Sequence, residues 1–66
     1  MKPGTIFEHK YWMDTKHMPL LCVVTAIRQR DVYWKAWEAG EPVGNSYCFP
    51  VGYVNRYVGQ VLEEPK

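Results

Sequence analysis

Strand-like residues that stop at a proline constrain this chain more than any other feature. Residues 32–37, Val-Tyr-Trp-Lys-Ala-Trp, are aromatic and β-branched types that are enriched in strands. A turn-forming stretch follows, and a second short run then reaches Pro50, with Tyr53 three positions beyond. Because proline has no backbone N–H to donate to a ladder, Pro50 is expected to end a strand. This order favours a small sheet with tight connections.

Size and composition limit the chain to one small domain. Its 66 residues are 47% hydrophobic and 15% aromatic, which is too rich for a disordered segment. A chain of this length buries only about 60% of its unfolded surface. Large aromatic side chains compensate, since each of them buries a large area. We therefore expect a single domain over residues 1–66.

Hydrophobic periodicity predicts an all-β fold with five short strands. The clearest strand is 20–28, which should pair antiparallel with 32–38 because the short link 29–31 cannot make a parallel crossover. The other predicted elements are a strand at 5–8, an irregular loop at 9–18, a turn at 39–45, a strand at 46–49, a helical or 3₁₀ turn at 50–55, a closing strand at 56–62 and a frayed tail at 63–66. Together these elements predict a small, strongly bent barrel, and the alternative is a four-stranded sheet with one short helix.

Residues 31–57 resemble the second half of a Src-homology-3 (SH3) domain. Tyr33-Trp34-Lys35-Ala36 matches the paired-aromatic strand, and Pro50-Val51-Gly52-Tyr53-Val54 matches the Pro-x-x-Tyr-Val corner. The resemblance implies an SH3-like barrel with a 3₁₀ turn before its last strand and a groove for proline-rich peptides at Tyr33, Pro50 and Tyr53. The family's opening Ala-Leu-Tyr-Asp-Tyr signature is absent, and the early loop holds one acid where the family often has several. The chain also looks like a small bacterial or phage protein.

Alternation along residues 32–38 divides the aromatic side chains between two faces. Trp34, with Val32 and Ala36, makes the better core set, so Tyr33 and Trp37 are expected to point outward. Exposed Tyr and Trp side chains are frequent binding anchors, although Trp37 covering the end of the barrel is an equal alternative. Of the aromatic pair in the early loop, one side chain is expected to be buried and the other to line the groove. The predicted partner-binding residues are Tyr33, Trp37, Pro50, Tyr53, Tyr11 and Trp12.

The charge distribution leaves nucleic-acid binding as the alternative function. The net charge is +1, with +3 in residues 1–35 and −2 in residues 36–66. A dedicated nucleic-acid binder is expected to be much more basic. The cations that would contact phosphates, with exposed aromatic side chains stacking on bases, are Lys10, Lys16, Arg28, Arg30 and Lys35.

Motifs for catalysis, metal binding or export are missing from the sequence. The two histidines and two cysteines are spaced His-x₇-His-x₄-Cys-x₂₅-Cys, which matches no zinc pattern. Ser46 has no nucleophile elbow, and no glycine-rich phosphate loop precedes a helix. Without a signal or membrane-spanning segment, Cys22 and Cys48 are expected to be reduced thiols in a cytoplasmic protein.

These observations predict a non-catalytic module that binds a protein or peptide partner. Neither a cofactor, a metal nor a membrane is expected. A third hypothesis is a structural subunit that self-associates through its aromatic surface, as a homo-oligomer.

Overall fold

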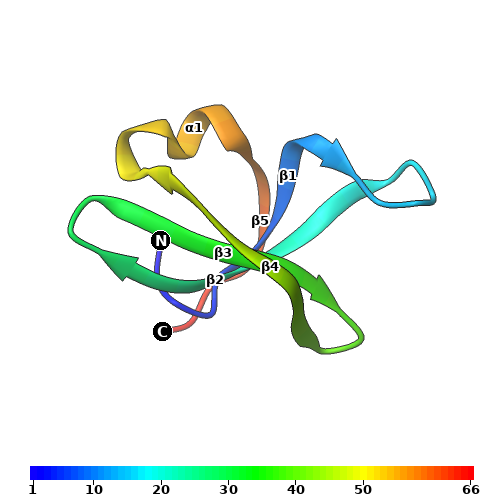
Figure 1. The fold of residues 1–66 in the computed structure, drawn as a ribbon, viewed down its shortest axis with the longest axis horizontal. Helices are drawn as coiled ribbons and strands as arrows, with labels where there is room; N and C mark the ends of the chain where they lie inside the picture. Colours follow the sequence, from blue (N-terminus) through cyan, green and yellow to red (C-terminus); the bar gives the residue numbers. More distant parts are fainter.

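One five-stranded antiparallel sheet, with the strand order β4-β3-β2-β1-β5, forms almost the whole molecule (Figure 1). The computed structural model describes residues 1–66. Its elements are β1 (Ile6–Met13), β2 (Pro19–Arg28), β3 (Asp31–Glu38), β4 (Glu41–Pro50), the 3₁₀ helix η1 (Val51–Tyr53), α1 (Val54–Tyr57) and β5 (Val58–Glu63). The predicted all-β class, the antiparallel β2–β3 hairpin and the 3₁₀ turn before the last strand are confirmed. No helix has the length and apolar character needed to span a bilayer.

β1 is longer than predicted, and it forms a projecting hairpin with β2. The strand continues to Met13, so an irregular loop beginning at His9 was wrong, and only residues 14–18 form the connection. Glu8 pairs with Leu21, but the next pair is Met13 with Pro19, so β1 bulges between these points. The bulge breaks the two-residue repeat, which explains why the sequence looked irregular. Figure 1 shows this hairpin end, which we call the arm (residues 9–20), extending away from the other strands.

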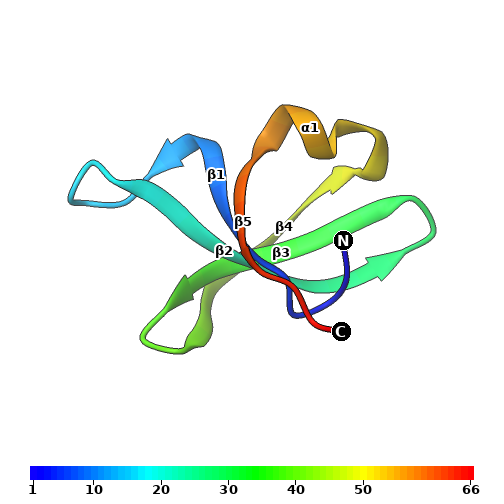
Figure 2. The same ribbon diagram turned by 180° about the vertical axis from the view of Figure 1, so that it is seen from behind.

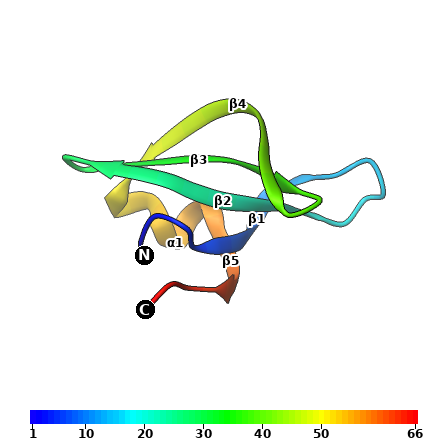
Figure 3. The same ribbon diagram turned by 90° about the horizontal axis from the view of Figure 1, so that it is seen from below.

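β4 begins directly after a two-residue turn. Ala39 and Gly40 both have positive φ, 53° and 81°, as a tight hairpin turn of type I′ requires. The predicted turn over residues 39–45 was therefore too long. Pro42 is accommodated because β4 is an edge strand, where a missing N–H leaves no ladder bond unmade. In Figure 3, β4 arches away from β3 in mid-strand, at the register shift between the pairs Trp34–Tyr47 and Ala36–Val43. Pro50 ends β4, as predicted.

β5 closes the fold against β1. It spans Val58–Glu63, so the predicted strand at 56–62 began too early and the tail beginning at residue 63 was also misplaced. Gly59 allows the close approach, since a Cβ atom there would lie 3.1 Å from the carbonyl oxygen of Glu8. The two chain ends lie on the same side of the molecule (Figure 2), and the amino group of Met1 is 3.4 Å from a carboxylate oxygen of Glu64.

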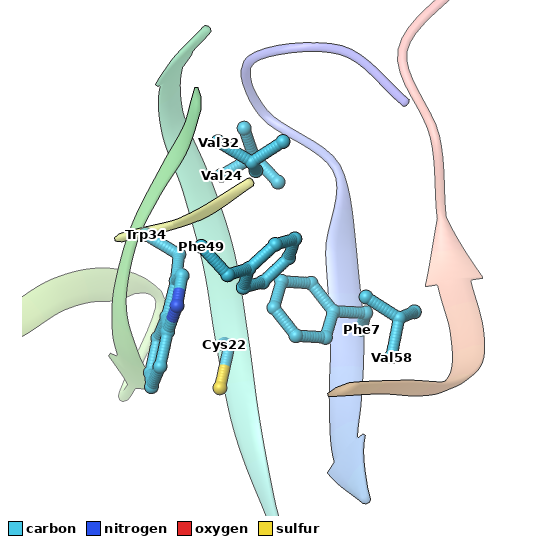
Figure 4. Close-up of a cluster of buried hydrophobic side chains, with 7 residues drawn as sticks. All are labelled: Phe7, Cys22, Val24, Val32, Trp34, Phe49 and Val58. Carbon is cyan, nitrogen blue, oxygen red and sulfur yellow. The ribbon is translucent and has the colours of Figure 1, made fainter. Parts of the chain in front are cut away.

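The core lies between the β2–β3 ladder and the β1–β5 pair. Figure 4 shows the side chains that point into this space, which are Phe7, Cys22, Val24, Val32, Trp34, Phe49 and Val58. Trp34 is only 3% exposed and meets the ring of Phe7 edge-on, with the ring centres 6.2 Å apart. The predicted inward face of β3 is thus confirmed for Val32 and Trp34, while Ala36 is half-buried.

Candidate functional site

An open groove of about 440 Å³ is lined by residues of the arm, β3, β4 and the η1–α1 segment. Most of its lining is aromatic, and no Asp, Glu, Lys or Arg side chain contributes to it. We call it the aromatic groove, and its lining residues are His9, Tyr11, Trp12, Trp34, Tyr47, Cys48, Phe49, Pro50, Tyr53 and Tyr57. Its size is in the range of small-molecule and peptide-binding clefts.

Three rings from three strands hold the arm side of the groove together. Trp12 meets Tyr47 edge-on at 4.9 Å between ring centres, and it meets Trp34 edge-on at 5.2 Å. Tyr47 in turn stacks on Trp34 at 5.0 Å. Edge-to-face and offset-stacked arrangements are the favoured ones, each adding about 0.5–1.5 kcal/mol beyond burial. The groove is therefore preformed on this side, with Trp34 belonging to both the core and the groove floor.

The other wall comes from the segment that follows Pro50. The N–H of Val51 donates to the carbonyl of Arg30 at 2.6 Å, which joins the start of η1 to the β2–β3 turn. Tyr57 then stacks on Phe49 at 5.5 Å and lies 6.3 Å from Tyr53. It also meets Tyr11 edge-on at 6.1 Å across the groove. Tyr57 thus joins the arm to the η1–α1 wall.

His9 stabilises the β1 bulge from which the arm extends. Its Nδ1 accepts hydrogen bonds from the backbone N–H groups of Tyr11 (3.0 Å) and Trp12 (3.1 Å), which have left the β1–β2 ladder. The ring is 5% exposed and stacks on Trp12 at 5.0 Å. Because Nδ1 is an acceptor, the neutral ring carries its proton on Nε2. Burial disfavours the imidazolium and lowers the pKa of His9 below its usual 6.5.

Acidification should destabilise the protein through His9. Since burial lowers the folded-state pKa, the unfolded chain binds this proton first, and stability is lost as the pH falls below about 6.5. Protonation of Nδ1 would also break both hydrogen bonds to the bulge. We expect the urea midpoint to drop between about pH 7.5 and 5.5 in the wild type and in His17→Gln. The drop should be clearly smaller in His9→Gln, and an equal drop in all three proteins would contradict this role.

Four of the six predicted partner-binding residues lie together in the aromatic groove. These are Tyr11, Trp12, Pro50 and Tyr53. The expectation that Tyr11 or Trp12 would be buried is wrong, because they are 62% and 42% exposed, respectively. The His9-capped bulge leaves both rings on the open side of the arm.

The other two predicted residues, Tyr33 and Trp37, lie outside the aromatic groove. Tyr33 borders a separate hollow with Thr25 and Arg28, and Trp37 borders one beneath the arm with Met13. Both are half-buried, which suits the alternative that Trp37 covers the end of the sheet. Tyr33 and Trp37 are one and three positions from Trp34, so alternation along β3 places both on the face opposite to it. Trp34 itself faces the core and the groove.

Sequence reasoning missed two groove residues, Tyr47 and Tyr57, for which a signal existed. Tyr47 is two positions before the buried Phe49 on β4, so both share one face, and it pairs directly with Trp34. Tyr57 is four positions after Tyr53, the spacing that brings side chains together on one helical turn. His9 had no such signal, because its role depends on a bulge that the pattern does not show.

The thiols differ in their surroundings. Cys48 is exposed beside the groove, whereas Cys22 is buried in the core, where burial raises its pKa to about 12. Iodoacetamide should therefore alkylate only Cys48 in the native protein at about pH 8, and both thiols in urea. The variant Cys48→Ser should lose the fast reaction. Equal labelling rates for the two thiols would show that Cys22 is accessible.

The structure contains no cluster of three or more His, Cys, Asp or Glu side chains that could hold a metal ion.

Comparisons of the chain with models of protein families, with characterised proteins and with solved structures found no match. The geometry of the aromatic groove is therefore the observation from which a function can be argued. Its rings are drawn from five elements of the fold, and those of Tyr11, Trp12, Tyr47 and Tyr53 are exposed.

Proposed function

We propose that this protein is a non-catalytic binding module whose aromatic groove takes an extended segment of a partner protein. The single observation that carries the proposal is the continuous row of exposed aromatic rings from Tyr53 to Tyr11 and Trp12, above a floor formed by Trp34. Tyr and Trp dominate the binding energy of protein interfaces because they bury much area at little cost in conformational entropy.

The floor of the groove offers hydrogen-bond donors that suit a peptide backbone. The indole N–H of Trp34, which lines the groove, donates to no acceptor in the protein. The Nε2–H of His9 is in the same situation. Backbone carbonyls of an extended chain are strong acceptors that repeat along its length. A peptide in the groove could therefore satisfy both donors while its side chains pack on the rings.

The resemblance to SH3 domains supports this proposal. In that family the proline and the tyrosine of the corner line the peptide groove, and here Pro50 and Tyr53 both line the aromatic groove. Polyproline II segments suit aromatic grooves because they are already extended before they bind. The position of Tyr33 departs from the family pattern, and Trp34 occupies the groove floor instead.

The placement of the cations disfavours nucleic acid as the partner. Of the five cations predicted to contact phosphates, only Lys10 comes from the part of β1 that borders the groove. Lys16 is at the arm's turn, Arg28 ends β2, Arg30 is in the β2–β3 turn, and Lys35 is on the opposite face of β3 from Trp34. They do not form one track beside the stacked rings, which a single strand needs.

Selection from a displayed library of random linear peptides tests the proposal. We expect enriched peptides whose binding is lost when Tyr11 and Tyr53 are replaced together. A short DNA duplex and a single strand, titrated at low and physiological salt, are the comparison. Tight low-salt DNA binding with a log–log salt slope steeper than about −3 would support the nucleic-acid alternative instead. Dimerisation that buries the groove would support self-association.

A further inference from the structure

We infer that the aromatic groove selects acidic peptides, in which one or two carboxylates beside the apolar contact residues pair with Arg56 and Lys10. The inference rests on the proposed function, because it specifies the chemistry of the segment that the groove would take. It also opposes the expectation from the resemblance, in which acids of the early loop bind a basic ligand residue.

Two cations border the η1–α1 side of the groove. The guanidinium carbon of Arg56 lies 5.8 Å from the ring centre of Tyr53, which lines the groove. The ammonium group of Lys10 donates to the carbonyl of Asn55 on α1, so this side chain reaches from β1 to the same segment. Positive charge from two elements thus gathers at α1, which follows the groove residue Tyr53 directly.

Neither cation is neutralised by the protein itself. The only ion pair in the structure joins the amino terminus to Glu64 and involves neither cation. No carboxylate lines the groove. Glu8 is two positions from Lys10 on β1 but forms no ion pair with it. The other acids are Asp14 at the arm's turn, Asp31 at the start of β3, Glu38 and Glu41 at the β3–β4 turn, and Glu63 and Glu64 at the end of the chain.

Two further carboxylates, those of Asp31 and Asp14, do not reverse this balance. Asp31 pairs with Pro50 in the β3–β4 ladder, but it also pairs with Arg28, and Arg30 precedes it. The charge of Asp31 is therefore offset by neighbouring arginines, neither of which lines the groove. On the arm, the carboxylate of Asp14 accepts the backbone N–H groups of Lys16 and Met18 at 2.8 and 3.0 Å. The carboxylate of Asp14 is therefore already hydrogen-bonded within the arm's turn.

The charges select the partner, while the rings supply most of the affinity. An exposed carboxylate–cation pair changes affinity by about two- to fivefold, and the planar fork of Arg56 favours a carboxylate through two parallel hydrogen bonds. A lysine in the same peptide position is repelled by a similar amount. We therefore expect an exchange of Asp for Lys at one such position to weaken binding by about tenfold.

The experiment starts from the strongest peptide of the random library and varies its charge alone. The probes are synthetic versions of that peptide with its acidic positions as Asp, Asn or Lys, titrated by fluorescence anisotropy. Affinity is expected to fall in the order Asp, Asn, Lys. Arg56→Gln should reduce the difference between Asp and Asn peptides, and Lys10→Gln should reduce it less. Lys35→Gln, on the other face of the sheet, should leave it unchanged.

The outcomes separate this inference from the proposed function. Enriched peptides that bind in the groove but are basic, or are indifferent to the Asp-to-Lys exchange, would overturn the inference and leave peptide binding intact. Peptides unaffected by loss of Tyr11 and Tyr53, or no enriched peptide at all, would overturn both. A single-stranded oligonucleotide that binds through Lys10 and Arg56 while no peptide binds would also overturn both, since these cations would then serve phosphates.

Discussion

Trp34→Ala should lower the free energy of unfolding by roughly 3–5 kcal/mol, the usual cost of removing a large buried aromatic side chain. The indole is 3% exposed and contacts Phe7, His9, Trp12 and Tyr47, so its loss leaves a cavity at the junction of three strands. A domain of this size usually has a total free energy of unfolding of about the same magnitude. Urea denaturation followed by far-ultraviolet circular dichroism should therefore show a largely unfolded variant even without denaturant.

The matched control is Trp37→Ala on the same strand. Trp37 is half-buried and belongs to neither the core cluster nor the groove, so the expected loss is below about 2 kcal/mol. If Trp37→Ala unfolds the domain while Trp34→Ala keeps a wild-type midpoint, the inward face of β3 has been assigned to the wrong residues.

Replacing both Tyr11 and Tyr53 by alanine should reduce peptide affinity by at least about 30-fold, which corresponds to the 2 kcal/mol of a binding hot spot. The two rings are 62% and 47% exposed, so their removal opens no core cavity and the urea midpoint should change little. They come from opposite walls of the groove, which means that a peptide lying along it must contact both.

The control for this variant is the pair Tyr33→Ala and Trp37→Ala, introduced together. Both residues were expected from the sequence to bind the partner, but both lie outside the groove. Their joint replacement should leave peptide affinity within about threefold of the wild type, as expected for residues outside an interface. A larger loss here than in the Tyr11 and Tyr53 variant would move the binding site to the other face of the sheet.

Local rules were enough to predict the β2–β3 hairpin, the end of β4 and the 3₁₀ turn that follows it, but not the start of β4. The short polar link before β3 specified an antiparallel hairpin, and Pro50 correctly ended β4 because it has no ladder donor. Alternation placed Trp34 in the core for the same local reason.

The arm and half of the groove could not be predicted in this way. They depend on a β1 bulge whose freed N–H groups are bonded by the imidazole of His9, and a bulge changes which face each following residue occupies. Tyr33 was assigned to the groove by its position in the SH3 pattern, but the pairing of Trp34 with Tyr47 brings the next residue there instead. β1, β4 and α1 meet at the groove through long-range packing, which cannot be deduced from the sequence of any one segment.

Three tryptophans allow the location of the binding site to be tested in one titration. Trp12 and Trp34 line the aromatic groove and Trp37 does not, so their indole N–H signals in a ¹H–¹⁵N spectrum report on separate places. On addition of the strongest selected peptide, the signals of Trp12 and Trp34 should shift while that of Trp37 stays in place. A shift confined to Trp37, with Trp12 and Trp34 unmoved at saturation, would contradict the assignment of function to this groove.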